Sequence, residues 1–169
     1  MNRNDISRAD RRILEILQDD SQTPAKTIAL EFGWSVASVY KRIRHLEEKG
    51  YIACYKAELN RSKLGFGILA YCHINLKDRS RKSMVGFEKE VCGYKEVLEV
   101  ITLSGESDYM LKVVSQNIET YKRFLLDILS NIEPVARFHS HIVLDEIKSA
   151  KAYPVESIQM NEEPMQSSQ

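Results

Sequence analysis

The sequence contains no hydrophobic run long enough to cross a membrane. No stretch of its 169 residues approaches the roughly 18 consecutive apolar residues that a membrane-spanning helix needs. The first residues, MNRNDISRADRR, are polar and include no apolar signal core. We therefore expect a soluble cytoplasmic protein that has no membrane partner.

Cysteine is also scarce. The three cysteines, Cys54, Cys72 and Cys92, are widely spaced, so no close pair suggests a zinc site or a redox motif. We expect them to be small buried hydrophobic residues. The sequence thus predicts neither a metal site nor a cofactor.

A net charge is missing as well. The 24 Lys and Arg residues balance 24 Asp and Glu residues, so overall basicity cannot indicate nucleic-acid binding. A nucleic-acid function would have to depend on basic residues that gather on one face. The hydrophobic fraction of 43% is ordinary for a globular protein. The length allows two small domains.

The first fifty residues predict three short amphipathic helices. Ser7 and Asp10 have the spacing of a capping box at the start of the first helix. Only Gly33 and Trp34 separate the second helix from the third, which favours a tight helix-turn-helix. Apolar residues recur at helical spacing over residues 7–20, 25–32 and 35–49. We place this domain, winged-helix-like in class, at residues 1–52.

The third predicted helix has a polar and basic side opposite its apolar stripe. Arg and Lys can bind guanine edges in the major groove of double-stranded DNA, and Ser can reach base edges or phosphates. A basic face exposed only to solvent is the alternative, but the preceding helix and the tight turn favour DNA. The predicted DNA-binding residues are Ser35, Ala37, Ser38, Tyr40, Lys41, Arg42, Arg44 and His45.

A second domain is predicted at residues 67–152, after an extended linker at residues 53–66. Its elements follow the order strand, helix, strand, strand, helix, strand, over residues 68–76, 81–91, 96–103, 108–115, 118–132 and 135–144. This βαββαβ order is that of ferredoxin-like domains, so the fold class is α+β. Helices on one face leave the other open for dimerisation. Residues 153–169 are polar and aperiodic, and we expect them to be disordered.

Several motifs occur together at the spacing of one family. They are Asp10-Arg-Arg-Ile-Leu14, Trp34-Ser35 followed by Val39, Arg42-Ile43 and Leu46-Glu47, then Gly50-Tyr51-Ile52, and Gly105 with Asp108-Tyr109. With these motifs the chain resembles the Lrp/AsnC, or feast/famine, transcriptional regulators from residue 6 to about residue 154. It departs from the family's usual pattern at Trp34, where Leu is usual, and at Ala37, where Thr is frequent.

The resemblance implies a homodimer built through the sheets of the second domain, often assembled further into an octamer. It also implies a small-molecule effector, commonly an amino acid, bound between subunits near the Gly105 turn. Backbone N–H groups there could receive a carboxylate. Asp108 could bind the amino group of the effector or merely cap the hairpin. The candidate effector-binding residues are Leu103, Ser104, Gly105, Glu106 and Asp108.

Two other functions remain open at this point. His139 and His141 share one face of the last predicted strand with Arg137, and some proteins of similar architecture are sirohaem decarboxylases that use histidines and arginines. Two imidazoles alone are an incomplete metal site, although His73 could join them. A ligand-sensing assembly protein that no longer binds DNA is the other alternative. We predict a regulator that is not an enzyme and has no catalytic residues.

Overall fold

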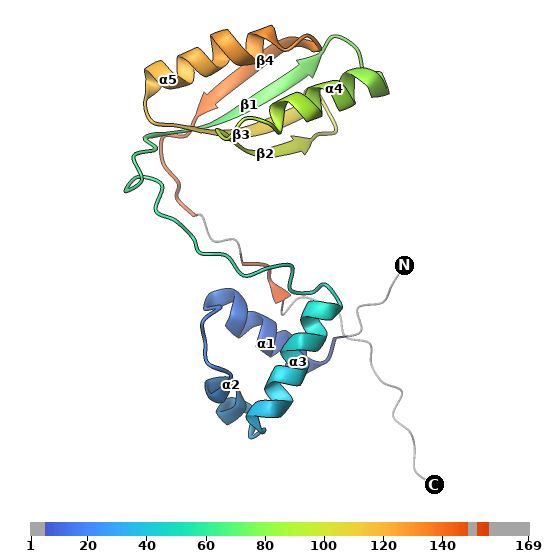
Figure 1. Cartoon of the computed structure of the whole chain (residues 1–169), viewed down its shortest axis with the longest axis vertical. Helices are drawn as coiled ribbons and strands as arrows, with labels where there is room; N and C mark the ends of the chain where they lie inside the picture. Colours follow the sequence, from blue (N-terminus) through green and yellow to red (C-terminus); the bar gives the residue numbers. More distant parts are fainter. Residues whose placement is uncertain (1–5, 149–151, 156–169) are drawn as a thin grey trace. The chain divides into compact units, whose positions relative to one another are not determined.

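The computed structural model describes residues 6–148 and 152–155, which divide into two compact units. One unit contains residues 6–57 together with 152–155, and the other contains residues 58–148 (Figure 1). The junction follows Ala57, inside the predicted linker. None of the helices in the described part of the chain is both long and apolar enough to span a membrane.

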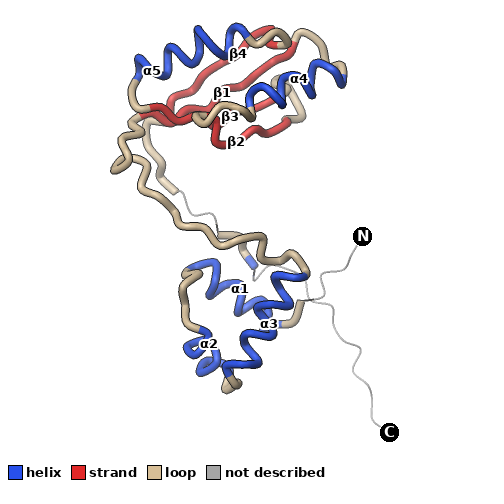
Figure 2. The backbone as a smooth tube through the Cα atoms, viewed as in Figure 1, coloured by secondary structure: helices blue, strands red, loops and turns tan. Residues whose placement is uncertain are grey.

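The first unit consists of three helices: α1 (Arg8–Asp19), α2 (Ala25–Phe32) and α3 (Val36–Glu48) (Figure 2). The predicted capping box is present at α1. The Ser7 hydroxyl accepts a hydrogen bond from the Asp10 N–H at 3.2 Å, and the Ser7 N–H donates to the Asp10 carboxylate at 3.0 Å. The backbone N–H groups of Ser7 and Asp10 both have hydrogen-bond partners as a result.

The turn between α2 and α3 depends on a left-handed glycine. Gly33 ends α2 with φ of 64°, and the Trp34 N–H then donates to the Ala29 carbonyl at 2.9 Å. Fully buried apolar side chains hold the three helices together, namely Ile13, Ile28, Val39 and Leu46. The fold of this unit confirms the predicted helix-turn-helix.

The second unit is a four-stranded antiparallel sheet covered by helices on one face. The strands are β1 (Ile68–Leu76), β2 (Val97–Thr102), β3 (Tyr109–Ser115) and β4 (Val135–Ile142), in the order β2-β3-β1-β4. The helices α4 (Arg81–Val91) and α5 (Ile118–Arg123) lie on the same side of the sheet (Figure 1). Phe87 of α4 and Tyr121 of α5 pack onto Cys72 and Leu111 there. This arrangement confirms the ferredoxin-like prediction.

The last helical segment changes type along its length, whereas the sequence predicts one helix over residues 118–132. After α5 the chain forms a π-helical turn, Phe124–Ile128, and a 3₁₀ turn, Leu129–Asn131. Phe124 and Leu129 are both buried although they are five residues apart. A π turn brings residues at that spacing onto one face, so the core contact accounts for the change.

The prediction of buried cysteines is right for one residue and wrong for two. Cys72 is fully buried on the helix side of β1. Cys54 is exposed because it lies in the segment after α3 that forms no helix or strand, and Cys92 is exposed because it forms the C-cap of α4. Burial and the hydrogen bonds from Tyr121 and Ser140 act in opposite directions on the Cys72 thiol, and burial dominates and raises its pKa.

Residues 153–155 of the described stretch 152–155 lie at the start of the segment predicted to be disordered, and they pack on the helical unit. The Tyr153 backbone N–H donates to the side-chain oxygen of Gln18 at 2.7 Å, and its carbonyl accepts from the side-chain N–H of Gln18 at 3.0 Å. Val155 is buried. The remainder of that segment, residues 156–169, lies outside the described residues.

Candidate nucleic-acid interface

The exposed side of α3 carries most of the residues predicted to contact DNA. Ser35, Ala37, Ser38, Tyr40, Lys41, Arg44 and His45 are exposed, and Arg42 is half-buried. The structure gathers a subset of them around a cavity of about 470 Å³, lined by Asp10, Trp34, Ser38, Lys41, Arg42 and His45. The basic residues of this helix therefore do collect on one side of the domain.

Ser35 caps the N-terminus of α3 and contacts Ser38. The Ser35 hydroxyl accepts from the Ser38 N–H at 3.2 Å and lies 2.8 Å from the Ser38 hydroxyl. This N-cap satisfies one of the free N–H groups of the first turn and leaves others for a ligand. Because the N-terminus of a helix attracts anions, the free N–H groups could receive an anionic group there.

The basic side chains on this side of α3 differ in their hydrogen bonds and ion pairs. Arg44 pairs with Glu48 at 2.9 Å, but both side chains are largely exposed, so the pair contributes little to stability and is easily exchanged. Lys41 and His45 make no side-chain hydrogen bond or ion pair within the described part of the chain. Both are therefore available to an incoming phosphate or base edge.

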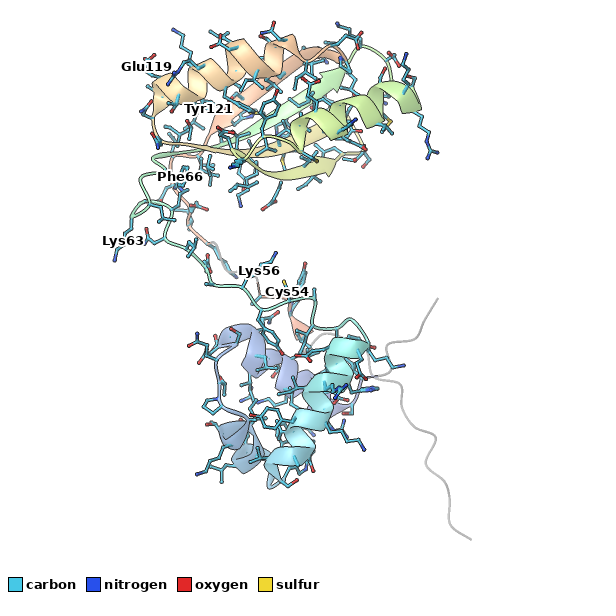
Figure 3. All side chains as sticks on the ribbon, viewed as in Figure 1. Cys54, Lys56, Lys63, Phe66, Glu119 and Tyr121 are labelled. Carbon is cyan, nitrogen blue, oxygen red and sulfur yellow. The ribbon has the colours of Figure 1, made fainter. Side chains whose placement is uncertain are left out.

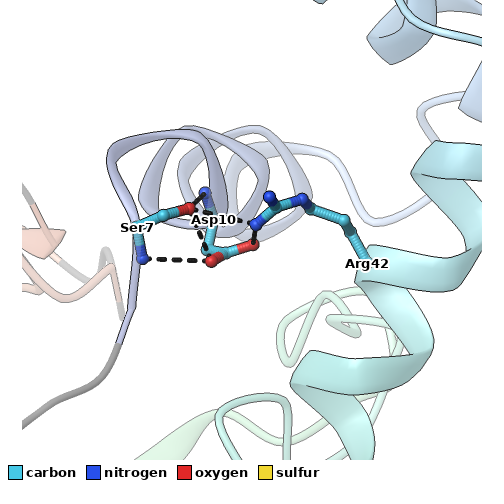
Figure 4. Close-up of polar contacts among 3 residues, drawn as sticks. All are labelled: Ser7, Asp10 and Arg42. Carbon is cyan, nitrogen blue, oxygen red and sulfur yellow. Dashed lines mark hydrogen bonds and ion pairs between the residues drawn. The ribbon is translucent and has the colours of Figure 1, made fainter.

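Arg42 is engaged inside the domain. Its Nη1 donates to Asp10 Oδ1 at 2.7 Å and to the Ser7 hydroxyl at 3.1 Å (Figure 4). Its guanidinium carbon lies 5.2 Å from the centre of the Trp34 ring, which in turn stacks on Phe32. Sequence reasoning grouped Arg42 with the exposed cations and missed the roles of Asp10 and Trp34. No sequence signal joins Asp10 to a residue 32 positions away.

The carboxyl of Asp10 responds to this arrangement. Burial pushes the pKa of Asp10 upward, but the hydrogen bonds from Ser7 and Arg42 outweigh it and hold the pKa below its ordinary value. The Asp10 side chain is only 8% exposed, whereas that of Arg42 is 41% exposed. Asp10 is therefore a buried, ionised partner whose charge Arg42 balances.

The predicted effector-binding turn lies at the end of the β2–β3 hairpin. Gly105 has φ of 139°, and Ser104, Gly105 and Glu106 are exposed beside a half-buried Leu103. The N–H groups of residues 104–106 form no hydrogen bond within the described part of the chain. These groups could receive an anionic ligand.

Both carboxylate oxygens of Asp108 already have partners within the protein. Asp108 is buried, its Oδ2 accepts from the Leu76 N–H at 2.8 Å, and its Oδ1 pairs with Arg79 Nε at 2.6 Å. Of the two predicted alternatives, the geometry favours a structural role at the hairpin end over an open site for an amino group. No local sequence pattern relates Arg79 to Asp108.

The face of the sheet opposite the helices carries the remaining histidines. His73 and His141 meet edge to face with ring centres 5.5 Å apart, and His139 is the cross-strand neighbour of His73. Arg137 donates from Nε to the side-chain oxygen of Asn75 at 3.2 Å. Within the described residues, no group of three or more His, Cys, Asp or Glu side chains could hold a metal ion.

Comparison with known families accounts for both units. A family model described as the Lrp/AsnC ligand binding domain matches residues 69–153. The chain belongs to the Lrp/AsnC family. A second model, described as winged helix-turn-helix DNA-binding, matches residues 6–53 of this Lrp/AsnC chain. The segment after α3, residues 49–67, forms no strand, so the described domain has the three helices without a β wing.

Relatives of this Lrp/AsnC protein are named as regulators. The chain is 32% identical to the leucine-responsive regulatory protein of Rhizobium meliloti, over 86% of this chain and 94% of that protein. It is 28% identical to the Bkd operon transcriptional regulator of Pseudomonas aeruginosa, over 89% of this chain and 99% of that protein. The chain is a transcriptional regulator with a helix-turn-helix domain and a ligand-binding domain.

Solved structures agree over almost the whole chain. An AsnC family transcriptional regulator from Agrobacterium tumefaciens has a TM-score of 0.84 and 29% identity, covering 91% of this chain and 100% of that one. A transcriptional regulator from Neisseria meningitidis, crystallised as a complex with L-Met, has a TM-score of 0.85 and 25% identity. That comparison covers 89% of this chain and 97% of the Neisseria chain.

Proposed function

We propose that this Lrp/AsnC regulator binds specific DNA sequences through the exposed side of α3. The observation that carries the proposal is the gathering of Ser38, Lys41 and His45 on one side of the helix-turn-helix, where Lys41 and His45 form no side-chain hydrogen bond or ion pair within the described chain. Arg44 joins them once its exposed pair with Glu48 exchanges. An α-helix fits the major groove, where such donors contact base edges and flanking phosphates. Ser35, Ala37 and Tyr40 complete the proposed surface.

The protein acts as a homodimer in this proposal, with the uncovered face of the sheet against a second copy. No helix of the described chain covers that face, and Ile101, His73 and His139 lie on it in one cross-strand row. Two identical faces related by a two-fold axis would place two α3 helices at the half-sites of a palindromic operator. Arg137, His139 and His141 then belong to this contact and not to a catalytic site, and the protein regulates without catalysing a reaction.

The effector is an amino acid, held at the Gly105 turn. The free N–H groups of residues 104–106 suit the carboxylate of the effector. Asp108 is already paired with Arg79, so the exposed carboxylate of Glu106 is the group that suits the amino group of the effector. The Neisseria regulator with L-Met supports this class of ligand. The effector alters regulation only if it binds the DNA-bound and free arrangements with different affinity.

Isothermal titration calorimetry with single amino acids, L-Met first, tests the effector site. Glu106→Gln should weaken the binding of the effector at least several-fold. The control is Glu119→Gln, an exposed carboxylate on α5 (Figure 3) that should leave binding unchanged. Equal affinities for wild type and Glu106→Gln would remove Glu106 from the site. Binding of no amino acid at millimolar concentration would overturn the proposed effector class.

A further inference from the structure

Arg42 is held from three directions inside the helix-turn-helix. The carboxylate of Asp10 and the hydroxyl of Ser7 accept from Nη1, and the Trp34 ring lies under the guanidinium. Ser7 and Asp10 come from the start of α1 (Figure 4), and Trp34 comes from the turn before α3. The Arg42 side chain therefore links α3, the helix that would enter DNA, to the start of α1 and to the turn before α3, which set the direction of α3.

Moving Arg42 onto a phosphate would leave Asp10 without its counter-ion. Asp10 is almost fully buried, and an unpaired buried carboxylate is strongly unfavourable. Lys41 forms no such ion pair within the described residues. It is the residue before Arg42 in α3, about 100° around the helix, and with His45 and Ser38 it lines the same cavity. The cavity is thus lined by one arginine that is held in an ion pair and by two basic side chains, Lys41 and His45, that have no side-chain partner within the described residues.

We propose that Arg42 is a positioning residue of the DNA-binding surface and makes no phosphate contact, and that a DNA backbone phosphate enters the cavity against Lys41 and His45. Through Asp10 and Trp34, Arg42 fixes α3 on the start of α1 and so sets where Lys41 and His45 meet the DNA. This inference rests on the proposed DNA-binding function and assigns the cations of that surface different roles.

A positioning role and a phosphate-binding role of Arg42 predict opposite effects on DNA affinity when the charge of Asp10 is removed. If Asp10 withholds Arg42 from phosphate, Asp10→Asn frees a cation, strengthens DNA binding and steepens its salt dependence. If Arg42 positions α3, Asp10→Asn lowers affinity for the specific site although the protein becomes more positive. Arg42→Gln should then have the same effect as Asp10→Asn, and the double variant should be no worse than either single variant.

The experiment measures dissociation constants of the full chain by fluorescence anisotropy at several salt concentrations. The ligands are a fragment that the wild-type protein enriches from sheared genomic DNA and a scrambled fragment of equal length. Circular dichroism selects a temperature at which every variant is folded, so that loss of fold cannot imitate loss of specificity. The variants are Arg42→Gln, Asp10→Asn, their combination and Lys41→Gln. The control is Arg12→Gln, which also removes one arginine and its ion pairs, with Glu15 and Glu31, in the same domain.

We expect Lys41→Gln to weaken binding to both fragments and to flatten the salt slope by about one. Arg42→Gln and Asp10→Asn should leave the slope unchanged and reduce the ratio of specific to non-specific affinity about tenfold, while Arg12→Gln should leave that ratio near wild type. A slope flattened by Arg42→Gln, or tighter binding by Asp10→Asn, would overturn the inference alone. Failure of the wild-type protein to bind any fragment would overturn the proposed function with it.

Discussion

Nη1 of Arg42 lies 2.7 Å from Oδ1 of Asp10, an ion pair between helices whose members are 32 residues apart in the chain. The pair places a charged contact at the point where α1 and α3 meet, next to the capping box of α1. Local helix formation and the placement of the DNA-binding helix therefore depend on the same carboxylate.

This relationship predicts acid sensitivity of the helix-turn-helix. The pKa of Asp10 is lowered in the folded protein, so the stabilisation is fully present above the ordinary value of 3.8 and is lost as pH falls through the lower folded value. Thermal melts followed by circular dichroism should therefore show a steeper loss of stability below about pH 4 in wild type than in Asp10→Asn. Parallel curves for the two proteins would show that Asp10 carries no such linkage.

The turn before α3 predicts a penalty for replacing Gly33. Its φ of 64° is strained for any residue with a Cβ, although no atom lies within 4 Å of the position that a Cβ would take. Gly33→Ala should therefore destabilise the helical unit by about 1 kcal/mol. Gly86→Ala is the matched control, because Gly86 lies within α4 with ordinary φ and open space, and it should be neutral or stabilising. Denaturant unfolding compares the two, and equal effects would argue against backbone strain at Gly33.

The buried hydroxyl of Tyr121 predicts a stability effect in the second unit. Tyr121, labelled in Figure 3, bonds through its hydroxyl to Ser140 and lies 3.1 Å from the Cys72 sulfur. Tyr121→Phe keeps the packing of the ring and removes these contacts, which should cost about 1 kcal/mol in the free energy of unfolding. Tyr153→Phe, at an exposed ring, should cost nothing measurable. A neutral Tyr121→Phe would mean that its partners find other bonds.

The uncovered sheet face predicts where a charge would disrupt assembly. Ile101 lies on that face in the same cross-strand row as Met110 and His73. Ile101→Asp should raise the dimer dissociation constant at least tenfold in analytical ultracentrifugation, because it would bury a charge against the second copy. Val85→Asp, on the exposed side of α4, is the matched control for the helix layer. If only Val85→Asp separates the subunits, the dimer uses the helices.

Periodicity predicted the elements well because their patterns are local. The bounds of β1 (Ile68–Leu76) and α4 (Arg81–Val91) match the expectation, and the other strands end within two residues of it. The order of these elements was enough to predict the ferredoxin-like sheet, since the βαββαβ sequence of elements allows few topologies.

The features that the sequence did not reveal depend on contacts that local patterns do not specify. Arg42 has the sequence signature of an exposed cation, and only folding brings Asp10 to it. Asp108 has the signature of a turn residue, and only the sheet brings Leu76 and Arg79 to its carboxylate. The π-helical turn at Phe124 arises because two core side chains stand five residues apart, which helical periodicity alone does not reveal.

Sequencing the genomic fragments that the protein retains at physiological salt tests most directly whether α3 selects DNA by sequence. The wild-type protein would be compared with a variant in which Lys41, Arg44 and His45 are all Ala, each with and without pooled amino acids. We predict that wild type enriches a small set of palindromic sites, that one amino-acid pool changes the set, and that the variant enriches none. Fragments without any enriched sequence, or the same sites retained by the variant, would contradict the assignment of α3 as the surface that recognises DNA.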